Sequence, residues 1–133
     1  MSDLNKALVQ KFFDIYNQGA WGQLDSLVSL DYIHHSNDSQ LTLAQFKRGA
    51  AWLRAGMPDF QIVSEDLISE TDKVAARCIG RGTHLASFFG EAPTSKTVTI
   101  YFTMIYRIQN SLIVEDWEAA DDAYFMKQIG ASA

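Results

Sequence analysis

The chain has 133 residues, a length that suits one hydrophobic core, and we expect a single domain over residues 1–133. Hydrophobic residues make up 47% of it and charged residues 20%, which is typical of a soluble globular protein and excludes a disordered or fibrous one. The formal net charge is -5, and the 11 Lys and Arg residues are scattered, so no basic surface for a nucleic acid backbone is expected.

The compartment is predicted from the N-terminus and the cysteine content. The first residues are charged and lead into an amphipathic pattern, which is not typical of a secretory signal. No apolar run approaches the ~20 residues that a membrane span needs. The only cysteine, Cys78, excludes an internal disulfide and suits a reducing compartment. We expect a cytoplasmic protein without a membrane partner.

Helical periodicity dominates the N-terminal part of the chain. Apolar residues recur at helical spacing over 2–17, and the pattern continues over 21–30. A short extended piece is predicted at 31–35. Thr42 is suited to cap a third helix, which should end near Gly56. Three helices are therefore expected to precede any long strand.

The second part of the chain has the pattern of strands. Four are predicted, over 60–69, 74–84, 97–108 and 112–119. Asn110 and Ser111 form a tight turn before the last one, and a short amphipathic segment follows it. Helices followed by adjacent long strands predict an α+β fold, with the N-terminal helices packed on a curved, mostly antiparallel sheet.

Alternation predicts which strand faces are buried. In 74–84 the even-numbered residues are small or apolar, whereas the odd-numbered ones include Arg77 and Arg81. In 97–108 the even-numbered side chains are almost all apolar, and the Thr- and Tyr-bearing face is left for solvent or a second subunit. Small residues beside large ones leave room for a cavity under the helices, unless a bulge changes the register.

The last strand carries acidic residues around a tryptophan. If Trp117 faces inward, the period of two turns Glu115, Ala119 and Asp121 to the same side. Up to two carboxylates would then point into the interior. Burying a carboxylate is costly, so a structural or functional role is expected for it. Glu115 could equally face solvent if this strand is bulged.

No standard cofactor or nucleophile motif is present. Gly80-Arg81-Gly82 lacks the third glycine of a dinucleotide fingerprint, and neither a phosphate-binding loop nor a nucleophile elbow occurs. The adjacent His34 and His35 would point to opposite faces of a strand, which makes a poor metal clamp. Cys78 lies in an apolar strand face, where packing is the favoured role. We therefore expect neither cofactor nor metal.

Acid-base groups remain as candidates for chemistry: Asp121, Glu115, His35, His84 and Asp59. A carboxylate in an apolar cavity has a raised pKa, because desolvation disfavours its charged form, and can then act as a base near neutral pH. Each candidate also has a structural reading. Asp121 could cap a terminal helix over 122–128, Asp59 could belong to a turn, and both histidines could be structural.

The order and spacing of several short motifs resemble the SnoaL-like polyketide cyclase (ester cyclase) family of the nuclear-transport-factor-like superfamily. The matching segments, which span nearly the whole chain, are Tyr32-Ile33-His34-His35, Met57-Pro58-Asp59-Phe60, Asp72-Lys73-Val74-Ala75-Ala76-Arg77, Gly82-Thr83-His84, Phe89-Gly90, Pro93-Thr94, Tyr106-Arg107-Ile108, Ile113-Val114-Glu115, Trp117-Glu118-Ala119-Ala120-Asp121 and Gln128-Ile129-Gly130. The resemblance implies a cone-shaped α+β barrel.

The resemblance also implies roles for particular residues. The Asp four residues after the Trp, here Asp121, would be the acid-base residue of an intramolecular aldol ring closure on a small hydrophobic or polyketide-like substrate. His35 and His84 stand at the family's histidine positions and would hydrogen-bond substrate or enolate oxygen. The implied substrate-binding residues are Trp117, Phe102, Met104, Trp52, Asp59 and Glu115.

Departures from the sequence patterns of related families limit which of their activities the chain can be expected to have. The chain has Asn110-Ser111 and Ser95 where the family usually has Gly. The oxyanion donors of ketosteroid isomerases are missing, because Phe12 and Met104 stand near those positions, and Ala119 replaces the second Asp of limonene-type epoxide hydrolases.

Three functions stay open. The first is a cofactor-free cyclase, or a related lyase or isomerase, with Asp121 in the pocket. The second is a non-catalytic small-molecule binder in which Asp121 only caps a helix. The third is an oligomerising accessory domain. A homodimer formed through the sheet is expected.

Overall fold

The computed structural model describes residues 2–130. In chain order its elements are α1 (Ser2–Gln18), the 3-10 helix η1 (Trp21–Ser26), β1 (Val28–Ser36), β2 (Ser39–Leu41), α2 (Leu43–Gly56), β3 (Gln61–Glu70), β4 (Lys73–Thr83), β5 (Thr97–Gln109), β6 (Leu112–Ala120) and α3 (Asp122–Gln128). Within these residues six strands form one sheet, in the order β2-β1-β6-β5-β4-β3. Only the β1–β6 pair of this described sheet is parallel. The predicted α+β fold with a mostly antiparallel sheet is confirmed.

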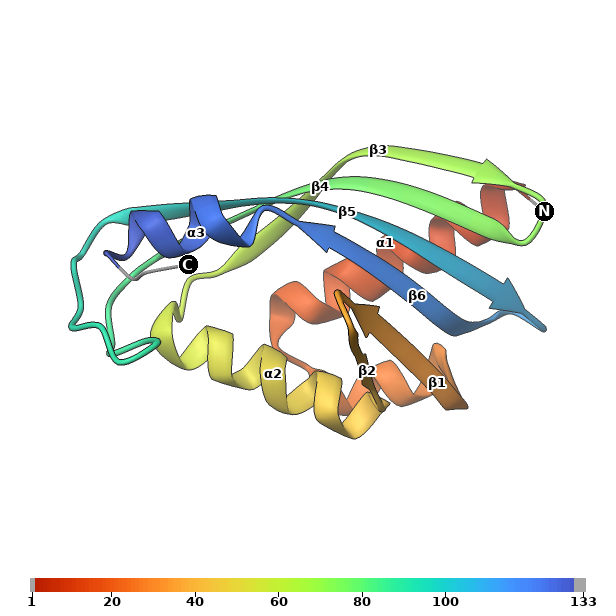
Figure 1. Cartoon of the computed structure of the whole chain (residues 1–133). Helices are drawn as coiled ribbons and strands as arrows, with labels where there is room; N and C mark the ends of the chain where they lie inside the picture. Colours follow the sequence, from red (N-terminus) through yellow and green to blue (C-terminus); the bar gives the residue numbers. More distant parts are fainter. Residues whose placement is uncertain (1, 131–133) are drawn as a thin grey trace.

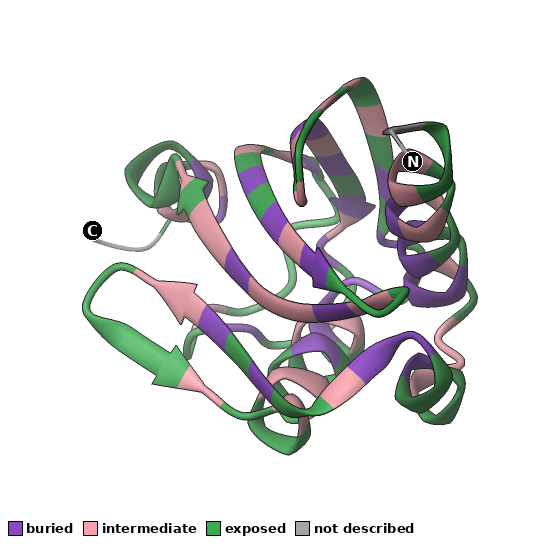
Figure 2. Cartoon of the chain, turned by 90° about the vertical axis from the view of Figure 1, so that its right-hand side faces the viewer, coloured by how far each residue is buried: buried purple, intermediate pink, exposed green. Residues whose placement is uncertain are grey.

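The helices lie where the curved sheet can enclose a core. Helix α1 packs against β3 and β4, α2 against β1 and β2, and α3 against β5. Figure 1 shows the long strands bending over α1, with α2 on the far side from β3 and β4. Buried and exposed residues alternate along the strands in Figure 2, so one face of the sheet covers the core and the other is outside.

Local signals set the ends of several elements. The Thr42 hydroxyl accepts a hydrogen bond from the Gln45 amide, and the Gln45 side chain accepts one from the Thr42 amide, which starts α2 with a capping box. Asn110 and Ser111 both have positive φ, 52° and 62°, as a two-residue hairpin turn between β5 and β6 requires. The predicted helix start and tight turn are confirmed.

The segment 21–36 differs from the sequence prediction. The helix ends at Ser26, and β1 begins at Val28 and runs for nine residues before α2. The prediction that three helices precede any long strand is therefore wrong. Val28 pairs with Ile113 of β6, a contact far away in the sequence that periodicity within 21–30 does not show.

The inward faces of β4 and β5 are those predicted, but the cavity is not where β4 has its small residues. A Cβ built on Gly80 would lie 2.4 Å from the Phe60 ring, and one on Gly82 would lie 2.9 Å from Met57. Those side chains fill the space beside β4. Cys78 on the same face is buried, in agreement with a packing role. The remaining room lies over β5 and β6.

Candidate active site

Two pockets that share wall residues lie between the helices and the strands β5 and β6, and we call them the outer and deep lobes of the interior cavity. The outer lobe has a volume of about 400 Å³ and the deep lobe about 100 Å³. The residues found in both walls are Tyr16, Phe46, Leu53, Ile100 and Glu118. Glu118 is the only charged residue among these shared members, so the two lobes meet at one carboxylate.

A buried histidine faces the outer lobe and is held by an aspartate. In the parallel β1–β6 pair, His34 lies opposite Asp116, and both side chains point inward. His34 Nδ1 donates to Asp116 Oδ1 at 2.5 Å, and the Tyr32 hydroxyl donates to Asp116 Oδ2 at 2.5 Å. Asp116 is 0% exposed. Because Asp116 occupies Nδ1, Nε2 is the nitrogen that His34 can offer to the cavity.

These partners shift the pKa of His34. Burial alone would lower its pKa, but the hydrogen bond and the negative charge of Asp116, with a contribution from Glu118, outweigh burial and raise the pKa above its usual value. An imidazolium with Nε2–H directed to a cavity can donate a hydrogen bond to a carbonyl or enolate oxygen.

Glu118 lies two residues beyond Asp116 on the same inward face of β6. Burial raises the pKa of its carboxyl, while His34 and a hydrogen bond of 3.0 Å from the Ser36 hydroxyl oppose that shift. A carboxylate with a raised pKa, placed beside an apolar cavity, is suited to take a proton from carbon. His34 and Glu118 therefore form an acid-base pair in one cavity.

The predicted inward orientation of Trp117 and Glu115 is wrong. A bulge in the β5–β6 ladder between Arg107 and Ile108 puts Val114 out of register, so Ile113, Asp116 and Glu118 point inward instead. This outcome is the bulged-strand alternative that the sequence left open for Glu115.

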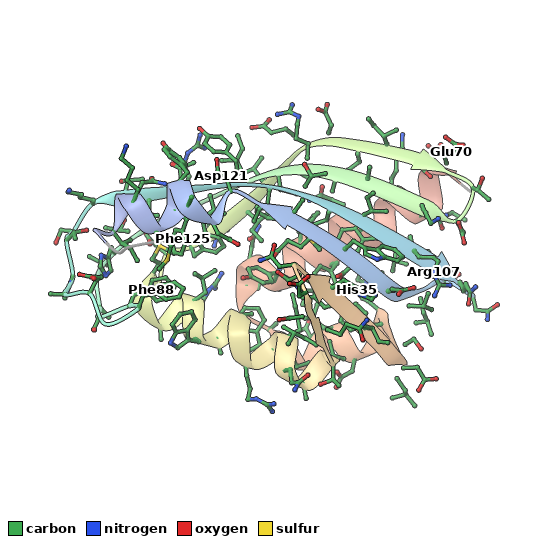
Figure 3. The ribbon with its side chains drawn as sticks, in the orientation of Figure 1. His35, Glu70, Phe88, Arg107, Asp121 and Phe125 are labelled. Atoms are coloured by element: carbon green, nitrogen blue, oxygen red, sulfur yellow. The ribbon has the colours of Figure 1, made fainter. Side chains whose placement is uncertain are left out.

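His35, Trp117 and Glu115 form a cluster on the outer face of the sheet. The His35 and Trp117 rings are stacked, with centroids 5.3 Å apart and an interplanar angle of 5°. His35 Nε2 lies 2.6 Å from a Glu115 oxygen, and Arg107 donates to the other Glu115 oxygen at 3.0 and 3.1 Å. Figure 3 shows His35 and Arg107 toward the same end of the β1–β6 region. His35 therefore does not share the interior cavity with His34.

Asp121 is exposed and caps α3. Its side chain accepts a hydrogen bond from the Tyr124 amide at 3.1 Å. It lines an outer hollow together with His35, Trp117 and Glu118, and is absent from the walls of both interior lobes. In Figure 3 Asp121 lies where β6 passes into α3. The structural reading of Asp121 as a helix cap is confirmed, and a catalytic role for it stays a prediction.

His84 and Asp59 lie away from the interior cavity. His84 is fully buried, its Nδ1 lies 3.2 Å from the Thr94 hydroxyl, and its Nε2 has no hydrogen-bond partner among the described residues. Asp59 accepts hydrogen bonds from the Thr83 amide and hydroxyl, both at 2.7 Å, and these bonds lower the pKa of its carboxyl. Asp59 thus belongs to a turn, which is the structural role that the sequence offered for it.

Three of the predicted wall residues do line the interior cavity. Phe102 and Met104 lie in the wall of the deep lobe, and Trp52 lies in the wall of the outer lobe. Trp52 stacks at a tilt on Phe88, with centroids 4.5 Å apart. Their contact with a substrate is a prediction.

Sequence reasoning missed Tyr32, His34, Asp116 and Glu118. The spacing gave part of the signal, because residues two apart on a strand share a face. Tyr32 and His34 are two apart in an extended segment, and so are Asp116 and Glu118. It was hidden because Trp117 was taken as the inward residue, and the bulge at Val114 has no local sequence mark.

Among residues 2–130 no group of three His, Cys, Asp or Glu side chains is arranged to hold a metal ion. Within that same range no helix is both long and apolar enough to cross a membrane.

The structure is an α+β fold in which a curved sheet and the helices surround a largely apolar cavity with a few convergent polar groups. The chain belongs to the SnoaL-like polyketide cyclase family, whose model matches residues 6–129. No curated protein sequence matches the chain significantly.

Solved structures of similar fold come from several bacteria. AclR of Streptomyces galilaeus, a candidate hydroxylase, is 23% identical, with a TM-score of 0.90 and 98% of each chain covered. IdmH of Streptomyces antibioticus, a candidate polyketide cyclase, is 23% identical, with a TM-score of 0.86 and coverage of 96% of this chain and 99% of that one. A candidate SnoaL-like polyketide cyclase from Jannaschia sp. CCS1 is 19% identical, with a TM-score of 0.87 and coverage of 100% and 96%. At these identities the likeness establishes the fold.

Proposed function

We propose that the protein is an acid-base enzyme that removes a proton from carbon next to a carbonyl group in a small, largely apolar, polyketide-like substrate. An intramolecular aldol ring closure is the reaction that this chemistry and the family membership favour. The observation that carries the proposal is that the Glu118 carboxyl and the His34 imidazole line the same cavity, whose other polar wall residues are Tyr16, Ser36 and Asp122.

The two side chains have complementary tasks. Glu118 takes the proton from the carbon, and burial makes it a stronger base than an exposed carboxylate. His34 donates from Nε2 to the carbonyl oxygen and so stabilises the enolate. Asp116 supports the positive charge of His34 and fixes its ring, and Tyr32 fixes Asp116.

The ring closure balances without an external reactant. One C–H bond breaks as Glu118 takes the proton, and the enolate carbon forms a C–C bond with a second carbonyl carbon as the C=O π bond of that carbonyl opens. The resulting alkoxide oxygen receives the proton that Glu118 took, which restores the carboxylate. The reaction is an isomerisation, so it consumes no oxidant or reductant. The cavity contributes by holding the nucleophilic carbon close to its target.

Asp121 is the competing base. The family pattern places the acid-base residue there, whereas its exposure and its bond to the Tyr124 amide favour a structural role. A non-catalytic binder would also hold a ketone in the cavity. Glu118 and His34 would then exchange no proton with the bound ketone.

We further propose a homodimer formed through the outer face of the sheet. Tyr101 and Ile105 are 48% and 41% exposed there, beside the stacked Trp117 and His35. Large side chains exposed together on a Thr- and Tyr-bearing strand face support an interface there.

The proposed function is tested by hydrogen–deuterium exchange at C1 of 2-tetralone, a flat ketone whose α-proton exchanges slowly in neutral water. The wild-type protein should accelerate the exchange in D2O, as followed by NMR. Glu118→Gln keeps the shape of the side chain and removes the base, so it should reduce the acceleration by about 10²- to 10⁴-fold.

Asp121→Asn is the matched control, because asparagine also caps helices and only the carboxylate is lost. This variant should retain the exchange. If Asp121→Asn loses the activity and Glu118→Gln keeps it, Asp121 is the base and the proposed assignment is wrong. If the wild-type protein binds the ketone without accelerating exchange, the binder alternative is favoured.

A further inference from the structure

The two lobes of the interior cavity differ in size and shape, and Glu118 lies at their junction. For a ligand in this cavity, a carbon that gives its proton to Glu118 would lie where the two lobes meet. The groups attached to that carbon would point into opposite lobes. The shape of the cavity then restricts which substituents the reacting carbon can carry.

The deep lobe is small and mainly apolar. Phe12, Phe13, Ile62, Phe102 and Met104 contribute to its wall, and the polar exceptions are Glu118 and the hydroxyls of Tyr16 and Tyr106. Its volume of about 100 Å³ is below the ~150 Å³ of an apolar protein cavity that stays dry and binds benzene. By that comparison it holds about three or four carbon atoms.

The outer lobe is larger and bounded by aromatic rings. The Phe88 ring lies between Trp52 and Phe125, with centroid distances of 4.5 and 5.6 Å. Figure 3 shows Phe88 and Phe125 toward each other between α2 and α3. Trp52 and Phe89 are 49% and 44% exposed, so this end of the lobe reaches the surface. Flat faces of this kind suit a planar aromatic body.

We propose that the ligand is a flat aromatic ketone with a short unbranched alkyl group on its reacting carbon, the aromatic body lying in the outer lobe and the alkyl group in the deep lobe. The inference rests on the proposed function in locating the ligand in the interior cavity with its reacting carbon beside Glu118. It does not require turnover.

The alkyl group is favoured over a polar substituent by the composition of the deep wall. A hydroxyl or amino group there would meet mostly ring and methyl carbons and would lose hydrogen bonds to water. An alkyl group instead gains free energy for each methylene removed from water, until the lobe is full.

The test is calorimetric titration of the wild-type protein with 1-alkyl-2-tetralones that carry hydrogen, methyl, ethyl, propyl, butyl or hexyl groups. Each added methylene up to propyl or butyl should tighten binding by about three- to fourfold. Hexyl should bind at least tenfold more weakly than the best member, because the chain exceeds the lobe. Affinity that is independent of chain length, or that falls from methyl onward, would overturn the proposal. Tighter binding of a 3-hydroxypropyl analogue than of propyl would overturn it too, since the tyrosine hydroxyls would then set recognition.

Two variants test which lobe sets the preferred length of the alkyl chain. Phe102 lines the deep lobe only, and Trp52 lines the outer lobe only. Phe102→Leu enlarges the deep lobe and should move the best chain length by one or more carbons toward hexyl. Trp52→Ala should weaken every member by a similar factor and leave the best length unchanged. An optimum that moves only in Trp52→Ala contradicts the assignment.

The outcomes of this test are separate from those of the proposed function. If Glu118→Gln keeps full deuterium exchange but the chain-length optimum is found, the two-lobed ligand holds and the base is another residue. If exchange depends on Glu118 and no optimum is found, the deep lobe does not take the alkyl group. Thermal unfolding of each variant confirms that it is folded before titration.

Discussion

Glu115 and Glu118 are three residues apart on β6 and lie in opposite environments. Burial alone would raise the pKa of the Glu115 carboxyl, but hydrogen bonds and charges of His35 and Arg107 lower it. Burial raises the pKa of Glu118, and the opposing effects of His34 and Ser36 are smaller. Residues three apart on a strand face opposite sides, and the bulge at Val114 decides that Glu115 is the outward one and Glu118 the inward one.

Substituting either glutamate with glutamine should change stability in opposite directions at pH 7. The raised pKa of Glu118 means that its charge costs stability as the pH rises above the unfolded value of about 4.3, so Glu118→Gln should raise Tm by roughly 2–4 °C. The lowered pKa of Glu115 means that its charge stabilises the fold above that pH, so Glu115→Gln should lower Tm. Both differences should vanish below about pH 3 in thermal denaturation. Equal effects of the two substitutions would contradict the assigned environments.

Asp116 should control the titration of His34. The stabilisation that accompanies the raised His34 pKa is complete below the unfolded value of about 6.5 and is lost as the pH rises through the folded value. Asp116→Asn removes the carboxylate that opposes burial, so the His34 pKa should fall, as measured by NMR titration of its ring protons. Tyr32→Phe removes one hydrogen bond to Asp116 but keeps the charge and should lower the pKa less. A His34 titration unchanged in Asp116→Asn would contradict the pair.

Among the elements, those with local signals were predictable from the sequence. Thr42 and Gln45 form the capping box that starts α2, and Asn110 and Ser111 supply the positive φ values of the last hairpin. The inward faces of β4 and β5 followed from alternation, because those strands are regular along their whole length.

Elements that depend on distant pairing were not predictable. Strand β1 starts at Val28 because β6 pairs with it, and the Val114 bulge shifts every residue after it to the other face. The candidate site combines these two elements, since His34 comes from β1 and Asp116 and Glu118 come from β6. An error of one residue in the β6 register therefore changed the predicted site as a whole, from the Trp117 face to the Glu118 face.

The contact between β4 and Phe60 gives a test at the scale of the element. A Cβ on Gly80 would lie 2.4 Å from the Phe60 ring, so Gly80→Ala should destabilise the protein by about 1–3 kcal/mol in urea denaturation. Gly22→Ala is the control, because no atom lies within 4 Å of its built Cβ. Its effect should stay within about 0.5 kcal/mol. Similar stabilities for the two variants would contradict the packing of Phe60 on β4.

On the scale of the whole molecule, the sheet separates two surfaces. Its inner face and the helices surround the cavity, whereas its outer face carries exposed apolar side chains and the His35 cluster. This separation allows chemistry inside and assembly outside in the same chain. It also explains how His34 and His35, adjacent in sequence, come to have unrelated surroundings.

The proposed homodimer should depend on the outer face. Ile105 lies opposite Trp117 in the β5–β6 ladder, and Ile105→Glu would place a charge in the centre of the interface. Sedimentation velocity should show a dimer for the wild-type protein and a monomer for Ile105→Glu. Leu4→Glu, on the exposed side of α1, should leave the dimer intact. A monomeric wild-type protein would contradict this proposal.

If the interior cavity with Glu118 and His34 is the reactive site, a ligand should bind there in a defined orientation. A crystal structure of the protein with bound 1-propyl-2-tetralone would show it. We expect the carbonyl oxygen within hydrogen-bond distance of His34 Nε2 and C1 of the ligand next to the Glu118 carboxyl. A ligand bound in the outer hollow against His35, Trp117 and Asp121, with the interior cavity empty, would contradict this assignment.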